Sequence, residues 1–214
     1  MAKAPPLPKN IVFDVGNVLL SWDPGKILDE HLPASADRKT WLDDIFTHPD
    51  WVELDRGTLD EEDAILGFAA RTGASADLIR RIVHSSKTSL APMQDSLALL
   101  EELHREFQRE PKGGPRLFVL SNMSRTTWEY LSPRHDFWRR FEGIVISAQL
   151  RLVKPDRAIY QHLLKQWSLD PAQTLFMDDR PENVEAARAL GIKSFVFTTA
   201  ADARARLHDG RWRD

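Results

Sequence analysis

The sequence of 214 residues contains no cysteine. Disulfides, thiolate metal sites and cysteine nucleophiles are therefore excluded, and any metal must be bound by oxygen or imidazole groups. A nucleophile, if the chain has one, must come from an Asp, Glu, Ser, Thr, Lys or His side chain. The absence of cysteine by itself says nothing about the redox compartment.

Long apolar runs and a strong excess of either charge are also missing. No run approaches the roughly 18 apolar residues of a membrane helix, and the proline-rich start lacks the apolar region of a signal peptide. The 29 basic and 32 acidic residues give a formal net charge of −3, which offers no basic surface for nucleic acid or anionic lipid. We therefore expect a cytoplasmic protein with no nucleic-acid or membrane partner.

Short apolar runs are present instead. Each is continuous rather than alternating and rich in β-branched or aromatic residues, which is typical of strands buried on both faces of a parallel sheet. Strand and helix patterns that follow one another in this way predict a doubly wound α/β fold. The expected strands are 11–13, 117–120, 143–146, 174–177 and 193–197, and helical patterns cover 92–107, 156–167 and 181–190.

The segment from about residue 22 to 90 has no strong strand run. An all-helical block between the first strand and the rest of an α/β sheet is typical of an inserted cap. We therefore predict a core made of 1–21 and 91–214 and a helical cap of 22–90, with a proline in each crossing, near 21–24 and 89–92. The expected cap helices are 24–32, 37–47, 59–72 and 75–88.

Polar side chains follow two of the early strands near their C-terminal ends, the edge at which ligands bind in open α/β sheets. Asp14 follows the first strand, and Gly16 lets the backbone turn tightly two residues later. Ser121 and Asn122 follow the second strand and lead into a helix whose first N–H groups form a seat for an anion. Each residue also has a plain structural explanation as a turn or a helix cap.

Charged side chains follow two of the later strands. Pro155 keeps the backbone of Lys154 extended. In this place the Lys154 ammonium can neutralise a phosphate and a neighbouring Asp. The plain structural alternative is a solvated surface lysine before a helix. The adjacent carboxylates of Asp178 and Asp179 repel each other unless a cation lies between them and other acids. This pair is the strongest indication of Mg²⁺ in the sequence.

The order of these four segments resembles that of the haloacid dehalogenase superfamily of phosphohydrolases. The segments FDVGNVLLSWDP, LSNMS, LVKPDRAIY and LFMDDRPENV are similar to the branch that includes α-D-glucose-1-phosphate phosphatase-like proteins. The resemblance covers essentially the whole chain. It implies an α/β core with an inserted helical cap, as the apolar pattern also indicates.

The resemblance further implies a Mg²⁺-dependent phosphomonoester hydrolase for a small phosphorylated metabolite, with a sugar phosphate as one candidate. Asp14 would attack phosphorus and carry the phosphoryl group transiently. Asp14, Asp179 and the carbonyl of Gly16 would bind Mg²⁺. Asp178 would lie in or next to this set, oriented by Asn183. The substrate and phosphate contacts would come from Asn17, Ser121, Asn122, Lys154 and Trp22, of which Lys154 also stabilises the transition state.

One position departs from the family pattern. Gly16 stands where most phosphatases of the superfamily have a second Asp, which protonates the leaving oxygen. General acid catalysis contributes about 10²–10⁴-fold, so either the leaving group is good or the acid comes from elsewhere. Two other functions stay open, namely a dehalogenase, whose halide leaves without a proton, and a regulatory or binding protein with weak turnover. The candidate acids are Asp23, His48, Asp50 and Asp55.

Aromatic residues are concentrated in the first quarter of the chain. Trp22, Trp41, Phe46 and Trp51 are interpreted as the core of the cap and its seam with the main domain, or, for Trp22, as a platform for a sugar face. Selectivity in this superfamily resides in cap residues without a transferable motif. The sequence therefore leaves open the substrate and whether the protein is a monomer or a homodimer.

Overall fold

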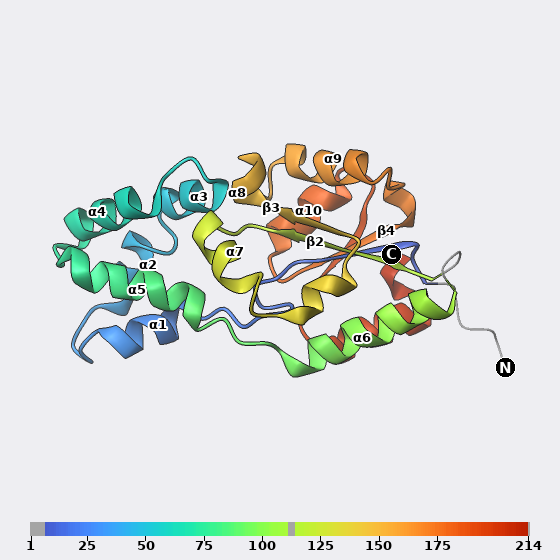
Figure 1. The fold of residues 1–214 in the computed structure, drawn as a ribbon, viewed down its shortest axis with the longest axis horizontal. Coiled ribbons are helices and arrows are strands. Elements are labelled where there is room, and N and C mark those ends of the chain that lie inside the picture. Colours follow the sequence, from blue (N-terminus) through green and yellow to red (C-terminus); the bar gives the residue numbers. More distant parts are fainter. Residues whose placement is uncertain (1–6, 111–113, 214) are drawn as a thin grey trace.

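The computed structural model describes residues 7–110 and 114–213, and a five-stranded parallel sheet forms its centre (Figure 1). The strand order is β3-β2-β1-β4-β5, so the chain runs outward from β1 in one direction and then crosses back to the other side. All five predicted strands are confirmed. They are β1 (Asn10–Phe13), β2 (Arg116–Ser121), β3 (Gly143–Ile146), β4 (Thr174–Asp178) and β5 (Lys193–Val196).

Both faces of the sheet are covered by helices. In β1, Ile11 and Phe13 pack on the side of α6 (Gln94–Arg109) and α11 (Ala200–Asp209). Val12 packs on the side of α9 (Arg157–Gln166) and α10 (Pro181–Arg188). Continuous apolar runs are required because neither face of the sheet meets water. This arrangement confirms the doubly wound α/β fold. The helices of this part are α6 (Gln94–Arg109), α7 (Arg125–Leu131), α8 (Ser147–Leu150), α9 (Arg157–Gln166), α10 (Pro181–Arg188) and α11 (Ala200–Asp209), with short 3₁₀ turns at Asp136–Arg140, Pro171–Gln173 and Arg211–Arg213.

The segment between β1 and α6 consists of helices that lie together at one end of the molecule, on the left in Figure 1. They share a hydrophobic cluster of their own, which includes Ile27, Ile65, Phe68 and Ile82. We retain the predicted division into core and cap as a proposal that this separate cluster supports, and note that residues 1–6 lie outside the described part. The cap helices are α1 (Pro24–His31), α2 (Arg38–Asp44), α3 (Pro49–Arg56), α4 (Glu61–Thr72) and α5 (Ala76–Thr88).

The cap contains one helix more than the sequence pattern predicts. The expected helix over 37–47 ends early as α2, and the separate helix α3 follows it. His48 caps α3, because its Nδ1 accepts a hydrogen bond from the N–H of Asp50 at 3.1 Å, and Pro49 occupies the first turn. A capping side chain followed by proline is a helix start. A helix of only 8 residues has too few apolar positions for its period to be recognised in the sequence.

The two crossings between core and cap lie side by side. The N–H of Ser21 donates to the carbonyl of Ala91 at 2.9 Å, and the N–H of Ala91 donates to the Ser21 hydroxyl at 3.3 Å. Next to these bonds, the N–H of Met93 donates to the carbonyl of Leu19 at 2.9 Å. The crossings therefore form one paired connection rather than two independent linkers.

Within the described ranges, no helix has the length and apolar composition needed to cross a membrane.

The end of α3 docks against the core. Arg56 forms an ion pair with Asp156 at 3.0 Å, between the cap and the start of α9. Gly57 follows with φ at 75°, and a Cβ at this position would lie 2.6 Å from the carbonyl oxygen of Ala148 in α8. Only glycine combines this left-handed conformation with so close an approach of two backbones. The cap is thus held against the C-terminal edge of the sheet.

We expect Gly57→Ala to destabilise the protein more than Gly73→Ala. Both glycines end cap helices in the left-handed region, at φ of 75° and 69°, so both substitutions carry the same backbone cost of about 1–2 kcal/mol. A Cβ on Gly73 meets nothing within 4 Å, whereas one on Gly57 collides with Ala148. Urea unfolding should show the additional loss for Gly57→Ala. Equal losses in the two variants would mean that this contact does not hold the cap.

Candidate active site

Carboxylates from two strands meet at the C-terminal edge of the sheet. Asp14 follows β1, while Asp178 ends β4 and Asp179 comes next. The two strands are paired neighbours, and the N–H of Asp14 donates to the carbonyl of Met177 at 2.9 Å. One oxygen from each of the three carboxylates lies within 4.8 Å of the others. The sheet therefore brings together the acids that the sequence singled out.

The buried ammonium of Lys154 lies against two of these acids. Its Nζ is 2.7 Å from Asp14 Oδ1 and 2.6 Å from Asp178 Oδ2, and its side chain is only 1% exposed. The cluster thus contains three carboxylates and one ammonium. The negative charge that the ammonium does not balance has little access to water, which is unfavourable unless a further cation neutralises it. Carboxylate oxygens are ligands that Mg²⁺ prefers. These residues therefore fit a divalent cation.

The surroundings shift the protonation of the cluster. Burial raises the pKa of Asp14 to about 7, although the charge of Lys154 opposes the shift. Burial also raises the pKa of Asp179, against a hydrogen bond from Asn17. Burial disfavours the charged form of Lys154, but Asp14 and Asp178 outweigh it and raise the pKa of the lysine. Lys154 is therefore charged at neutral pH, and the carboxylates are the groups that additional positive charge would stabilise.

Asp178 is held by three neighbours. Its Oδ2 accepts a hydrogen bond from Lys154 Nζ at 2.6 Å. Its Oδ1 accepts from the N–H of Arg180 at 2.9 Å and from Asn183 Nδ2 at 3.0 Å. Asn183 reaches the carboxylate because Pro181 starts α10 directly after the strand. Asn183 thus donates to Asp178, and Asp178 positions Lys154. A role of Asn183 in metal binding and a direct contact of Asp178 with a metal stay predictions.

Asn17 connects the first segment to the acidic pair. Its φ of 51° is left-handed, a conformation that Asn tolerates better than most residues. Its Nδ2 donates to Asp179 Oδ2 at 3.1 Å, and its Oδ1 accepts from the N–H of Trp22 at 2.9 Å. The amide of Asn17 is therefore engaged in positioning Asp179. Its contact with phosphate remains a prediction.

The residues at the end of β2 are also tied to Lys154. Asn122 Nδ2 donates to the carbonyl of Lys154 at 2.9 Å, and the N–H of Lys154 donates to Asn122 Oδ1 at 2.8 Å. This pair of bonds holds the segment before α9 against β2. Ser121 is buried beside it as the last residue of the strand. The phosphate contacts predicted for Ser121 and Asn122 stay predictions, and the Asn122 side chain is the one that orients Lys154.

Trp22 packs within the cap. Its ring centroid lies 5.7 Å from that of Phe46 and 5.9 Å from that of Trp51, and it borders the hydrophobic cluster of the cap. Trp41 borders the same cluster. These contacts favour the interpretation of the aromatic residues as the core and seam of the cap. A substrate contact of Trp22 stays a prediction.

Three of the four candidate acids are engaged within the cap. Asp23 caps the first turn of α1, His48 caps α3, and Asp50 forms an ion pair. Asp55 differs, because it lies at the end of α3 where the cap meets the core, and its backbone carbonyl accepts a hydrogen bond from the Ser147 hydroxyl of the core. Residue type alone could not separate Asp55 from the other three.

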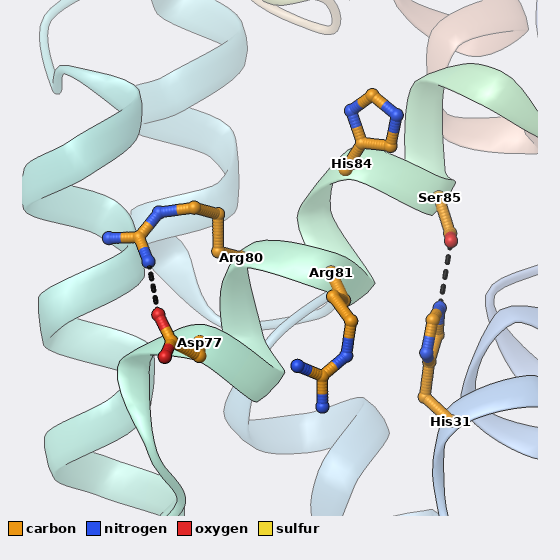
Figure 2. Close-up of a pocket in the computed structure, with 6 residues that line it drawn as sticks. All are labelled: His31, Asp77, Arg80, Arg81, His84 and Ser85. Atoms are coloured by element: carbon orange, nitrogen blue, oxygen red, sulfur yellow. Dashed lines mark hydrogen bonds and ion pairs between the residues drawn. The ribbon is translucent and has the colours of Figure 1, made fainter.

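A separate hollow, lined by polar and charged residues, lies between α1 and α5 of the cap (Figure 2). His31 Nε2 is 2.7 Å from the Ser85 hydroxyl across it, and Arg80 forms an ion pair with Asp77 at 2.7 Å. It contains none of the residues of the four sequence segments and is not the candidate active site. Its lining residues are His31, Asp77, Arg80, Arg81, His84 and Ser85.

Comparison with known proteins identifies the family. Residues 58–197 match the family of haloacid dehalogenase-like hydrolases. The sesquiterpene phosphatase astK of Aspergillus oryzae is 29% identical over 190 residues, which cover 89% of this chain and 90% of that protein. The D-ribitol-5-phosphate phosphatase of Bacteroides thetaiotaomicron is 27% identical over 212 residues, which cover 93% of this chain and 96% of that protein.

A solved structure shows the same fold. The crystal structure of a haloacid dehalogenase family enzyme from Bacteroides thetaiotaomicron, in complex with magnesium and inorganic phosphate, has a TM-score of 0.66 and 21% sequence identity. The similarity covers 89% of this chain and 94% of that chain.

The chain belongs to the haloacid dehalogenase-like hydrolase family. It is therefore a hydrolase, and the family resemblance predicted from the four sequence segments is confirmed. The narrower resemblance to α-D-glucose-1-phosphate phosphatase-like proteins stays a prediction.

Proposed function

We propose that this protein is a Mg²⁺-dependent phosphomonoester hydrolase that acts on a small phosphorylated metabolite. The observation that carries the proposal is the cluster of Asp14, Asp178 and Asp179, in which Lys154 contacts Asp14 and Asp178. The cluster supplies a carboxylate nucleophile, oxygen donors for a divalent cation and an ammonium for phosphate charge in one place. Two phosphatases among the relatives support the reaction class, and the related structure with magnesium and phosphate supports the cofactor.

Asp14 is the proposed nucleophile. Its backbone is fixed by the end of β1 and by the bond to Met177, and its side chain is 10% exposed, so the carboxylate is rigid and poorly hydrated. One of its oxygens attacks phosphorus to form an aspartyl phosphate, which water then hydrolyses. This covalent route divides one difficult displacement into two easier steps.

Lys154 is the proposed partner of the phosphoryl group. Its ammonium lies beside the nucleophile, where it can neutralise the negative charge that spreads over the phosphoryl oxygens in the transition state. Asp178 holds the ammonium, and the Asn122 side chain holds the backbone of Lys154, so the position of the lysine is set before substrate arrives. Preorganised charge of this kind needs no rearrangement during the reaction.

The residues proposed to hold Mg²⁺ are Asp14, Asp179 and the carbonyl of Gly16, with Asp178 next to them. When bound, the cation neutralises the carboxylates and polarises the phosphoryl group. Asn17 keeps Asp179 turned toward the site.

The cap is proposed to select the leaving group. A sugar or polyol phosphate is the substrate class that we favour, since one relative is a D-ribitol-5-phosphate phosphatase. The aromatic side chains of Trp22, Phe46 and Trp51 lie in the cap close to the first crossing, and an apolar face of this kind also suits the hydrocarbon chain of a terpenyl phosphate. Both classes belong in a substrate screen.

We expect the protein to release phosphate from at least one ester in a panel, and only with Mg²⁺. The panel contains p-nitrophenyl phosphate, hexose phosphates, ribitol 5-phosphate and farnesyl phosphate, each assayed with Mg²⁺ and with EDTA. Chelation should reduce turnover to background, because the carboxylate cluster then lacks its counter-charge. The absence of release from every ester in the presence of Mg²⁺ would contradict the proposal.

The same screen distinguishes the two other functions. Halide release from 2-chloropropionate without a metal would identify a dehalogenase. Binding of a protein partner that Asp14→Asn does not affect, without any turnover, would identify a regulatory protein. The carboxylate cluster argues against the dehalogenase, because expulsion of a halide requires neither a proton nor a divalent cation.

A further inference from the structure

The site lacks an acid at the position where the family usually has one. Gly16 provides no side chain, although a Cβ there would meet nothing closer than Trp22 Cβ at 3.9 Å. An alkoxide leaves slowly without a proton, and a general acid contributes about 10²–10⁴-fold. Hydrolysis of an alkyl phosphate therefore needs a proton donor from another part of the chain.

Asp55 is held by the loops that follow β2 and β3. The hydroxyl of Ser147, directly after β3, donates to the backbone carbonyl of Asp55 at 2.5 Å. The Ser147 hydroxyl oxygen also accepts a hydrogen bond from the N–H of Met123 at 2.8 Å. The next N–H, that of Ser124, lowers the pKa of the Asp55 carboxyl group. A cap residue is thus fixed to the same edge of the sheet that carries the acidic cluster.

The charges that act on the Asp55 carboxylate come from the active site. They are those of Lys154, the ammonium of the cluster, and Arg180, which directly follows the acidic pair. On α3 itself, Glu53 and Arg56 form an ion pair with each other at 3.2 Å. Asp55 is therefore an acid of the cap whose carboxyl group responds to the charges of Lys154 and Arg180.

Burial brings Asp55 into the range of a proton donor. It raises the pKa of Asp55 to about 7, against the lowering by the Ser124 N–H and by the charges of Lys154 and Arg180. A carboxyl group with this pKa is partly protonated at neutral pH. It can donate a proton and, once ionised, accept one.

We propose that Asp55 is the general acid and general base of this hydrolase, supplied by the cap in place of the acid missing at Gly16. The inference rests on the proposed phosphatase function. In the first step an oxygen of Asp14 bonds to phosphorus, the ester P–O bond breaks, and the proton of Asp55 passes to the leaving oxygen to give an alcohol. In the second step water bonds to phosphorus, its proton passes to Asp55, and the bond from phosphorus to Asp14 breaks, which releases phosphate.

The test compares two esters of similar shape and different leaving group. Asp55→Asn should lower kcat/KM for benzyl phosphate by about 10²-fold or more, because benzyl alkoxide needs a proton. For p-nitrophenyl phosphate the loss should stay below about 10-fold, because p-nitrophenolate leaves without one. The wild-type profile for benzyl phosphate should fall above about pH 7, as Asp55 loses its proton, and the variant should lack this fall.

Two further variants make the result specific. Asp50→Asn removes an acid of the same helix that is paired with Arg71 inside the cap, and it should change neither ester by more than about 3-fold. Gly16→Asp in the Asp55→Asn background adds a side chain whose Cβ is in ordinary contact with Trp22, and its carboxyl group should restore part of the benzyl phosphate activity. The inference would be overturned if Asp55→Asn lowered kcat/KM equally for both esters and Gly16→Asp did not restore it. It would also be overturned if Asp55→Asn left kcat/KM for benzyl phosphate unchanged.

Failure of the proposed function would look different. The wild-type protein would then release no phosphate from either ester. Failure of the inference about Asp55 leaves wild-type turnover intact and changes only the response to the leaving group.

Discussion

Asp14→Asn should abolish Mg²⁺-dependent phosphate release, with a loss of at least about 10³-fold in kcat. The amide preserves the shape of the side chain but cannot attack phosphorus or form an aspartyl phosphate. It also removes one of the three carboxylates that would hold the cation, so the affinity for Mg²⁺ should fall in the same variant. Steady-state phosphate release and calorimetric titration with Mg²⁺ measure the two effects separately.

The matched control for this variant is Asp95→Asn, which removes an exposed carboxylate in the first turn of α6. It should leave phosphate release and Mg²⁺ binding unchanged, because its side chain lies outside the acidic cluster. Retention of more than about a tenth of wild-type kcat by Asp14→Asn would show that another group attacks phosphorus.

Lys154→Met should lower the free energy of unfolding by about 3–5 kcal/mol and eliminate turnover. The ammonium contacts two carboxylates, and its removal leaves the fully buried Asp178 without its counter-charge. Urea unfolding measures the loss. Lys87→Met is the matched control, since Lys87 lies 2.8 Å from both carboxylate oxygens of Glu61 in a pair whose side chains are 11% and 25% exposed.

The control should cost less, because water reaches Glu61 when its partner is removed. A double-mutant cycle provides the second check. Asp178→Asn in the Lys154→Met background should recover part of the lost stability, because the buried charge disappears with its partner. A loss below about 1 kcal/mol for Lys154→Met, or additivity of the two substitutions, would show that the pair is not coupled in the folded state.

Local pattern predicted most of the fold. The five strands were recognisable because both faces of each are buried, which forces a continuous apolar run such as that around Val12 and Phe118. Three of the described α-helices are not predicted by the sequence pattern, namely α3, α8 and α11. In α11 the buried positions include Ala200 and Ala203, whose small side chains give a weak apolar period. A short helix or an alanine-rich face packs well in the folded protein without a strong signal in the sequence.

The candidate site was predictable as a set of residues but not as a set of contacts. Asp14, Lys154 and the Asp178–Asp179 pair lie at strand ends or before helices, and the sequence pattern predicts where these strands end and these helices begin. That the Asn17 amide supports Asp179, and that the Asn122 side chain supports Lys154, depends on how separate loops meet. From the sequence alone, both amides are predicted to contact phosphate.

The sequence by itself determined the α/β fold, the family and the acids that carry the proposed chemistry, because burial and turn formation depend on neighbouring residues. The tertiary structure decided which of these groups touch. Parallel pairing of β1 with β4 brings Asp14 to the acidic pair, and docking of α3 on α8 brings Asp55 to the same edge while Asp23, His48 and Asp50 remain in the cap. Such contacts join residues far apart in the chain, and only the packing of whole elements sets the distances between them.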